Sequence, residues 1–295
     1  MYKIFKLLFH GLFIKINKYA AKMILYFEKQ DNIVSDKKWD ILFGNKDKML
    51  FNIDANLKVY LYKDSVLSRF IHTGGFEEDE IKYVLKTLKA GDTFIDIGAN
   101  IGLFSLLASK KIGDNGKVIC FEPAPETYKR LNENIELNQI KNVESRNLGL
   151  SDKEDELKFY ISDTGFDAWN SFAPTNDYKL RKAIDIKVST LDKQLEDLDK
   201  STIKFIKIDV EGWEKFVIQG GKKFFQNYAP IVMLEFTEEN TFNAGYNIHD
   251  IFGELETLGY EWFRIVNGEL VKEVKTMHYP YINLIAKKNQ TNISR

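Results

Sequence analysis

The sequence is short of the residues that form covalent cross-links or soft metal sites. Its 295 residues include one cysteine, Cys120, so an intrachain disulfide and a cysteine-rich zinc site are both excluded. The four histidines, His10, His72, His249 and His278, are far apart and match no HxH or HExxH spacing. A structural zinc ion is therefore not expected, whereas an oxygen-ligated Mg²⁺ ion stays open.

Long apolar runs and an excess of one charge are also missing. No apolar run reaches the ~18 residues that a membrane span needs. The net charge of −1 gives no indication of a nucleic-acid partner. With 44% apolar and 29% charged residues, the composition is that of a globular, cytoplasmic protein with one large domain or one domain with extensions.

The first 30 residues differ from the rest of the chain. They carry six lysines against a single acid, Glu28, with bulky apolar residues in between. This pattern fits a basic amphipathic helix, which would allow peripheral contact with the anionic inner face of a membrane. The alternative, which we favour slightly, is a helix docked on the domain with its lysines in solvent. A signal peptide fits less well, because lysines interrupt the apolar stretch.

The remaining sequence predicts three segments: a lead-in at 31–90, a domain of alternating strands and helices at 91–286, and a polar tail at 287–295. Within the domain, short apolar runs alternate with helical spacings. Strands are expected at 93–97, 117–121, 143–148, 203–208 and 231–236, and also at 57–62, 156–161, 184–188, 260–265 and 281–286. Repeated β-α-β units predict an α/β fold with a mostly parallel central sheet and helices on both faces.

A glycine-containing motif follows the first strand of the alternating region. Asp96, Gly98, Asn100 and Gly102 stand where open α/β sheets bind ligands. The glycines allow a sharp turn and close packing of the next helix. A dinucleotide fingerprint has a glycine where Asn100 stands, and the asparagine side chain would obstruct a diphosphate. We expect Asn100 to bind the amino-acid end of a ligand and Asp96 to suit its ammonium group.

A carboxylate, Glu122, follows the second strand of this region. An acid at this distance from the glycine motif can hold both hydroxyls of a ribose, because it offers two acceptor oxygens. Its alternative role is to complement the dipole of the next helix. A ribose, an ammonium group and no diphosphate describe S-adenosylmethionine (SAM) better than NAD. Asp152, beyond the third strand, is a candidate acceptor for the adenine amine, with a role as a turn residue equally favoured.

Two further carboxylates, Asp209 and Glu211, follow the strand at 203–208 and should reach the same edge of the sheet. Methyl transfer to a hydroxyl needs in-line alignment, which contributes ~7–11 kcal/mol, and removal of the hydroxyl proton, worth about 10²–10⁴-fold. We expect Asp209 to take the proton, with Glu211 as second choice and Mg²⁺ bound by both as an optional activator. The alternative is that one of them caps the next helix.

The second motif also separates acceptor classes. Methyltransferases of exocyclic base amines carry a D/N-P-P-Y/F sequence at this point, where this chain has Asp-Val-Glu-Gly. Cytosine C5 enzymes need a thiolate, but Cys120 lies in the middle of a predicted strand and is expected in the core. A nucleic-acid acceptor is therefore not expected.

Four stretches resemble the FkbM family of methyltransferases. In chain order they are FIDIGANIGLFS (Phe94–Ser105), FEP (Phe121–Pro123), NLGLSD (Asn147–Asp152) and KIDVEGWE (Lys207–Glu214). The resemblance covers roughly residues 91–265 and implies a Rossmann-like class I fold, SAM as methyl donor, and O-methylation of a sugar, polyketide or glycan hydroxyl. Gly149 and Trp213 depart from residues common in the family, which concerns fine specificity alone.

The acceptor side is less defined. Phe166, Trp169 and Phe172 lie in the loop 162–177, where aromatic faces could pack on a sugar ring or simply cover the sheet edge. The leading hypothesis is a SAM-dependent O-methyltransferase acting on a sugar or glycan. The alternatives are a nicotinamide-dependent oxidoreductase, which Asn100 disfavours, and a non-catalytic SAM-binding or scaffold protein, which the intact Asp209 disfavours.

Overall fold

The computed structural model describes residues 37–74, 76–162, 170–173 and 181–288. The proposed helix at 1–30, two of the loop aromatics (Phe166 and Trp169) and all but the first two residues of the polar tail lie outside these ranges. The chain divides into two compact units, Met1–Met49 and Leu50–Arg295. In the first, the rings of Trp39 and Phe43 pack with centroids 4.6 Å apart. Within the described ranges, every helix is too short or too polar to span a bilayer.

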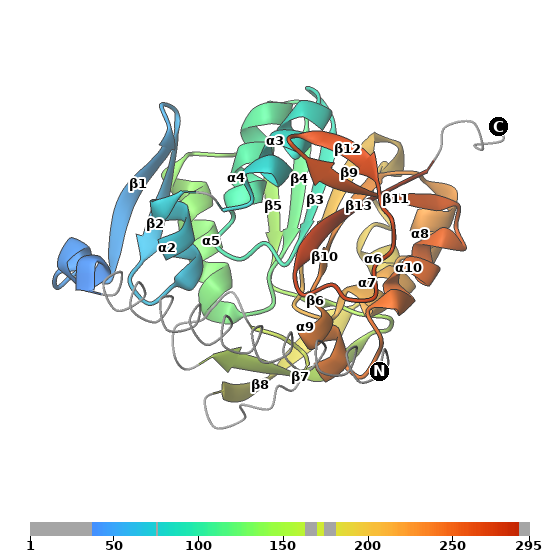
Figure 1. Cartoon of the computed structure of the whole chain (residues 1–295). Helices are drawn as coiled ribbons and strands as arrows, with labels where there is room; N and C mark the ends of the chain where they lie inside the picture. Colours follow the sequence, from blue (N-terminus) through green and yellow to red (C-terminus); the bar gives the residue numbers. More distant parts are fainter. Residues whose placement is uncertain (1–36, 75, 163–169, 174–180, 289–295) are drawn as a thin grey trace, which may run out of the picture. The chain divides into compact units, whose positions relative to one another are not determined.

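The second unit is built on one large sheet (Figure 1). Its strands run in the order β12-β11-β13-β10-β9-β3-β4-β5. From β5 to β10 all neighbours are parallel, whereas β13 is antiparallel to both β10 and β11. The strands are β3 (Thr93–Ile97), β4 (Lys117–Phe121), β5 (Val143–Arg146), β9 (Ile203–Ile208), β10 (Ile231–Phe236), β11 (Tyr260–Val266), β12 (Glu269–Lys272) and β13 (Ile282–Lys288). The order reverses between β3 and β9, which makes their carboxyl ends the ligand edge of such a fold.

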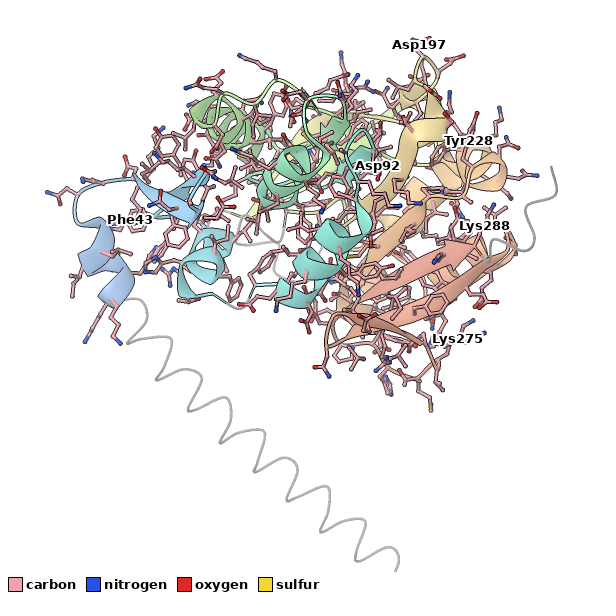
Figure 2. All side chains as sticks on the ribbon, turned by 90° about the horizontal axis from the view of Figure 1, so that it is seen from above. Phe43, Asp92, Asp197, Tyr228, Lys275 and Lys288 are labelled. Atoms are coloured by element: carbon pink, nitrogen blue, oxygen red, sulfur yellow. The ribbon has the colours of Figure 1, made fainter. Side chains whose placement is uncertain are left out.

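Helices cover both faces of this sheet, so the Rossmann-like architecture predicted from the sequence is confirmed (Figure 1). One face packs on α3 (Glu78–Thr87), α4 (Leu103–Ile112) and α5 (Pro125–Leu137). The other packs on α6 (Leu191–Gln194), α7 (Glu214–Gly220), α8 (Lys222–Asn227) and α10 (His249–Glu256), whose apolar side chains join those of the strands in one core. The last strand is fastened to α8, because Lys288 Nζ donates to the carbonyl oxygens of Phe225 and Gln226 (Figure 2).

A second sheet interrupts the alternation. It holds β6 (Gly149–Leu150), β7 (Asp155–Ser162) and β8 (Arg181–Ser189) in the order β6-β8-β7. The strand expected at 143–148 therefore ends at Arg146, and the chain then joins a different sheet. Phe172, a candidate for sugar contact, is buried with Phe159 and Ile186 in the small core of this sheet. Phe172 therefore covers the sheet, which was the simpler of the two roles predicted for it.

Several elements were not foreseen from the sequence. They are the strands β1 (Lys48–Asp54), β6 and β12, the helices α2 (Val66–Thr73), α6, α8 and α9 (Glu238–Asn243), and the 3₁₀ turn η3 (Lys200–Thr202). The predicted β2 (Leu57–Tyr62) is confirmed and pairs with β1. The helix expected from residue 101 begins at Leu103, because Gly102 adopts a left-handed conformation with φ 95°.

Candidate active site

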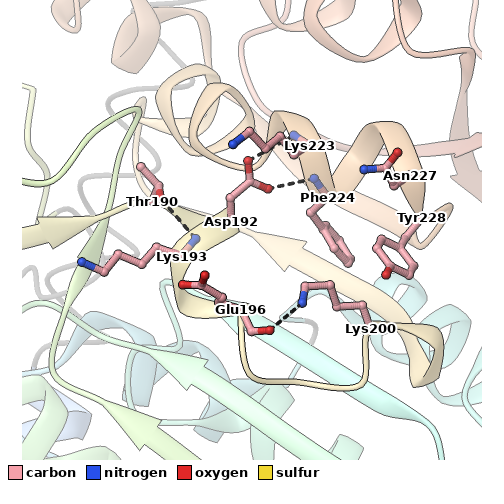
Figure 3. A pocket seen from close by; sticks show the side chains of 9 residues that line it. All are labelled: Thr190, Asp192, Lys193, Glu196, Lys200, Lys223, Phe224, Asn227 and Tyr228. Atoms are coloured by element: carbon pink, nitrogen blue, oxygen red, sulfur yellow. Dashed lines mark hydrogen bonds between the residues drawn. The ribbon is translucent and has the colours of Figure 1, made fainter.

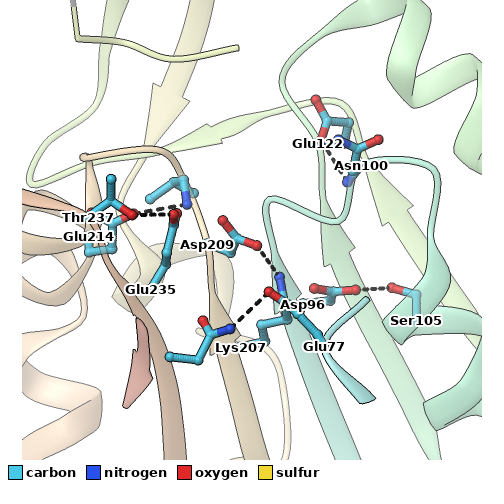
Figure 4. A network of polar contacts seen from close by, with 12 residues as sticks. Glu77, Asp96, Asn100, Ser105, Glu122, Lys207, Asp209, Glu214, Glu235 and Thr237 are labelled. Atoms are coloured by element: carbon cyan, nitrogen blue, oxygen red, sulfur yellow. Dashed lines mark hydrogen bonds and ion pairs between the residues drawn. The ribbon is translucent and has the colours of Figure 1, made fainter. Parts of the chain in front are cut away.

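A row of buried polar side chains crosses the large sheet near its carboxyl edge (Figure 4). Asp96 on β3 lies opposite Lys207 on β9, and Glu235 on β10 lies opposite Asn283 on β13. Met233 on β10 pairs with Lys207, and Glu235 lies two residues beyond Met233. Because side chains alternate between faces along a strand, all four polar side chains lie on the same face. Polar residues buried in this number point to a ligand or to one another as partners.

The glycine motif forms a tight loop between β3 and α4. Gly98 has φ 83°, and a Cβ added there would overlap the carbonyl oxygen of Asp209 and lie 2.9 Å from its carbonyl carbon. Asn100 also has a positive φ of 51°, and its Oδ1 accepts from the amide of Ile101 at 2.8 Å. A Cβ on Gly102 would lie 2.5 Å from Leu131 Cδ1 on α5. The two glycines thus have the close-packing roles predicted for them, whereas the Asn100 carbonyl group holds its own loop.

Glu122 joins this loop to the end of β4. Its Oε2 accepts from the amide of Asn100 at 2.9 Å, and its Oε1 accepts from the amide of Ala124 at 2.9 Å. Asn147, just beyond β5, donates to the carbonyl oxygens of Glu122 and Pro123. A carboxylate can accept more than two hydrogen bonds, so these amides fix the orientation of Glu122 toward a ligand. Its alternative as a helix-dipole charge is compatible with the same position.

Lys207 is the buried cation of the site. Its Nζ donates to Asp209 Oδ2 at 2.6 Å and lies 4.9 Å from the ring centroid of Phe104. Burial opposes its charge, but the carboxylates of Asp209, Glu77 and Asp96 outweigh burial and raise the pKa of Lys207. For Asp209 the attraction of Lys207 outweighs burial in the same way and lowers its pKa. Asp209 is therefore held ionised beside Lys207.

Two carboxylates, the buried Asp96 and the half-buried Glu77, flank Lys207. Asp96 lies within β3 rather than beyond its end, and its Oδ2 accepts from the hydroxyl of Ser105 at 2.7 Å. Glu77 precedes α3, and its Oε1 accepts from the hydroxyl of Tyr281 and the amide of Asn283, each at 2.9 Å. Burial raises the pKa of both acids. Among the described residues, Asp96 Oδ1 and Glu77 Oε2 have no hydrogen-bond partner, so both can meet a cationic group.

Three carboxylates converge beside Lys207: one oxygen each of Asp209, Glu211 and Glu235 lies within 4.8 Å of the others. Glu211 Oε2 accepts from Asn240 at 2.6 Å, and Glu235 Oε1 accepts from the hydroxyl of Thr237 at 2.6 Å. Burial raises the pKa of Glu211 and of Glu235, and the neighbouring carboxylates raise both further. Of the three acids, Asp209 is thus the one held ionised.

The loop that carries Asp209 and Glu211 is shaped by Glu214, the first residue of α7. Its Oε1 accepts from the amides of Val210 and Gly212 at 3.1 and 3.2 Å, which supports positive φ values at Glu211 and Gly212. Burial raises the pKa of Glu214 to about 7. The helix begins without a side-chain cap, so the alternative role of Asp209 or Glu211 as its cap is wrong.

The remaining predicted residues lie apart from this cluster or in the core. Asp152 is exposed, and its Oδ1 accepts from the hydroxyl of Ser151 at 3.0 Å. Cys120 is fully buried in β4, as expected for a core residue, and burial raises the pKa of its thiol. Sequence reasoning gave no role to Glu77, Lys207 or Glu235. The available signal was the position of Lys207 and Glu235 near the ends of neighbouring strands; Glu77 is far away in sequence and gave none.

A hollow on another part of the surface is a weaker candidate for a ligand site than this cluster (Figure 3). It lies beside α6 and α8, before the start of β9, and is therefore at the amino edge of the parallel strands. Its polar groups serve the structure: Asp192 accepts from the amides of Lys223 and Phe224, and Lys200 donates to the carbonyl oxygen of Glu196. Ligands of open α/β sheets bind at the opposite edge.

Similarity to known proteins covers the part of the chain that holds this site. A family model described as the methyltransferase FkbM domain matches residues 96–262. Hexuronic acid methyltransferase AglP of Haloferax volcanii is 28% identical over 157 residues, which are 53% of this chain and 61% of that protein. Methyltransferase 1 of Beauveria bassiana is 30% identical over 149 residues, 44% of this chain and 58% of that protein. The chain thus spans about three fifths of the length of these curated relatives.

Solved structures of similar fold include methyltransferase FkbM from Methylobacillus flagellatus, with a TM-score of 0.45, 14% identity and coverage of 68% of this chain and 44% of that one. Another is M. jannaschii TYW2 in complex with AdoMet, with a TM-score of 0.44, 14% identity and coverage of 83% and 86%. The family model alone spans more than half of the chain and contains the glycine motif, Glu122 and Asp209. This chain belongs to the FkbM family of methyltransferases.

Proposed function

We propose that the chain transfers the methyl group of SAM to a hydroxyl group of a sugar or glycan. The observation that carries this proposal is the direct contact between the glycine loop and the acidic loop. The Asp209 amide donates to the Ile97 carbonyl oxygen at 3.0 Å, and Gly98 leaves no room for a side chain against Asp209. A cofactor bound on the glycine loop would therefore hold its reactive carbon beside an ionised carboxylate.

On the donor side, Glu122 binds the ribose hydroxyls, held in place by the amides of Asn100 and Ala124. Gly98 and Gly102 keep the loop close to the sheet, and the loop lacks the second glycine of a diphosphate site. The unpartnered Oδ1 of Asp96 suits the ammonium group of the amino-acid end. Asp152 stays in the proposal as the adenine contact, on its sequence position alone.

On the acceptor side, Asp209 takes the hydroxyl proton as the oxygen attacks the methyl carbon. Its lowered pKa keeps it ionised, whereas Glu211 is held toward its neutral form and orients the acceptor. The oxygen gains the methyl group, the sulfonium leaves as the neutral thioether of S-adenosylhomocysteine, and the proton ends on the carboxylate. This chemistry requires no metal, so the optional Mg²⁺ ion is not part of this proposal.

A sugar acceptor is supported by the relative named for hexuronic acid. The two products expected from such a sugar differ in stability: a methyl ether survives mild alkali, whereas a methyl ester is hydrolysed. An acidic edge repels an incoming carboxylate and favours a hydroxyl acceptor. Alkali-stable product would support O-methylation of a hydroxyl, and alkali-labile product would contradict it.

Other parts of the proposal rest on the sequence alone. They are a methyltransferase domain at 91–286 preceded by a lead-in at 31–90, a cytoplasmic location, membrane contact through residues 1–30, and no role for nucleic acid. The match of the family model to residues 96–262 lies inside the proposed domain.

Calorimetry of the purified protein with SAM, S-adenosylhomocysteine and NAD tests the proposal first. We expect binding of the two adenosyl ligands, loss of that binding in Glu122→Ala, and no binding of NAD. Glu126→Ala is the matched control, because Glu126 lies four residues later and its side chain is exposed. Binding of NAD alone would overturn the proposal in favour of the oxidoreductase alternative, and adenosyl binding without transfer to any glycan would favour the scaffold alternative.

A further inference from the structure

The cluster of Asp209, Glu211 and Glu235 holds more carboxyl groups than methyl transfer requires. Oxygens of the three carboxylates lie within 4.8 Å of one another. Lys207 is the buried cation nearest to them, and its Nζ is committed to Asp209 Oδ2 at 2.6 Å. Carboxylates this close cannot all be ionised unless further positive charge lies between them.

Each member of the cluster has one oxygen anchored by a separate donor. Lys207 holds Asp209, the Asn240 amide holds Glu211, and the Thr237 hydroxyl holds Glu235. One oxygen of each carboxylate thus fixes the side chain, and the other can serve as a ligand. Such outer hydrogen bonds are characteristic of carboxylates that bind metal ions.

Glu235 provides a second, independent observation. The residue is only 5% exposed to solvent, and its Oε2 has no hydrogen-bond donor among the described residues. Oxygens of Asp209 and Glu235 lie within 4.8 Å of each other, and two ionised carboxylates at that distance repel. A cation or a proton between them would relieve this repulsion.

We infer that Asp209, Glu211 and Glu235 form a binding site for one hard divalent cation of the Mg²⁺ and Mn²⁺ class. Oxygen ligands select hard cations, and the four histidines and one cysteine of the chain supply no ligand to this set. Three protein ligands leave positions open on a six-coordinate ion. An acceptor hydroxyl bound at such a position would have a lowered pKa.

Glu235 is the residue that distinguishes this site from the proposed function. Asp209 and Glu211 already have roles beside the methyl group, whereas Glu235 has none without an ion. Its neighbour Thr237 is equally informative, because its hydroxyl contacts Glu235 Oε1. The inference goes beyond the proposed function, since transfer from SAM does not require a metal.

Mn²⁺ titration of the full chain, followed by electron paramagnetic resonance, tests the site directly. We expect one saturable Mn²⁺ ion, displaced by Mg²⁺, and binding weakened roughly tenfold or more in Glu235→Gln. Thr237→Val should weaken binding by a smaller factor. Glu239→Gln, an exposed acid on α9 outside the cluster, should bind Mn²⁺ as the unmodified chain does.

Absence of saturable Mn²⁺ binding, or equal binding in Glu235→Gln and Glu239→Gln, would overturn the inference and assign the Asp209–Glu235 contact to a shared proton. Calorimetry with S-adenosylhomocysteine on the same samples separates the two proposals. Retained binding of that ligand without Mn²⁺ binding rejects the metal site alone. Circular dichroism of Glu235→Gln checks its fold, which the amide should preserve because it has the size and shape of the carboxyl group.

Discussion

Gly98 is the point where the glycine loop touches the acidic loop, and Gly98→Ala tests that contact. The residue has φ 83°, a conformation that alanine adopts only with strain. Its added Cβ would overlap the backbone oxygen of Asp209, which no rotation of a side chain can relieve. The Asp209 loop must therefore move away from β3, and the hydrogen bond from the Asp209 amide to the Ile97 carbonyl must lengthen or break.

The expected cost has two parts. Left-handed backbone costs alanine roughly 1–2 kcal/mol, and loss of the amide hydrogen bond costs about 0.5–1.5 kcal/mol. Together they give about 1.5–3.5 kcal/mol. For a chain of this size, each kcal/mol shifts the melting temperature by roughly 2–4 °C, so we expect Gly98→Ala to melt roughly 3–14 °C lower.

Thermal unfolding followed by circular dichroism measures this shift, and calorimetry with S-adenosylhomocysteine measures the site. Gly91→Ala is the matched control: Gly91 has φ 85°, and an added Cβ would meet no atom within 4 Å. The control should show the strain cost alone and keep ligand binding, whereas Gly98→Ala should lose both stability and binding. Equal melting shifts with binding retained in both variants would refute the close approach of the two loops.

Three further results are expected. Lys207→Met removes the buried cation from among its carboxylates and should destabilise the fold by about 3–5 kcal/mol in urea unfolding; an unchanged midpoint would contradict its role. Glu144→Gln should cost less than about 1 kcal/mol at pH 7, since its carboxylate is partly exposed. Lys117 and Arg146 lower the pKa of Glu144, so this difference should shrink as pH falls below about 4, and a constant difference would argue against the pairing. If residues 1–30 contact a membrane surface rather than the domain, their deletion should abolish sedimentation with anionic vesicles; unchanged sedimentation would reject membrane contact.

The alternating part of the fold was readable because each strand is a short apolar run. Val118, Ile119 and Cys120 are buried on both faces of β4, which is the pattern of a parallel strand covered by helices. The passage of the chain to the second sheet after Arg146 was not readable, because Asn147 makes long-range hydrogen bonds to Glu122 and Pro123. Contacts of this kind join distant parts of the chain and leave no local periodicity.

The candidate site was partly readable, because strand ends can be located from the apolar runs before them. Loop ends after strands predicted where Gly98 and Asp209 would lie, and topology brought them together. Glu77 is separated from β3, the first strand of the large sheet, by the whole of α3 and a loop. Its approach to Asn283 therefore depends on the packing of α3 against the strands at the end of the chain. The predicted partner of Asp96 was a ligand ammonium group, whereas its protein neighbours are Ser105 and Lys207.

The acidic character of the edge bears on how the transfer is accelerated. Methyl transfer removes the positive charge of the sulfonium, so carboxylates near the sulfur stabilise the donor more before the reaction than at the transition state. Such uniform or ground-state stabilisation does not raise the rate. The acids must therefore contribute at the acceptor, where a hydroxyl loses its proton. In the proposed reaction, the catalytic contribution would then come from Asp209, whose pKa is lowered, rather than from the total charge of the cluster.

Asp209→Asn separates the two effects, because it keeps the size of the side chain and removes its basicity. If Asp209 acts on the acceptor, kcat should fall by about 10²–10⁴-fold, while the affinity for S-adenosylhomocysteine, which carries no sulfonium charge, stays within a few fold. The affinity for SAM should fall only by the attraction between one carboxylate and the sulfonium charge. Asp197→Asn is the control, because Asp197 is exposed and lies before β9, whereas Asp209 follows that strand (Figure 2). It should change neither kcat nor the affinity for either ligand. A variant that loses SAM affinity while its kcat holds would show that Asp209 serves the donor, and the assignment of the proton acceptor would then pass to Glu211.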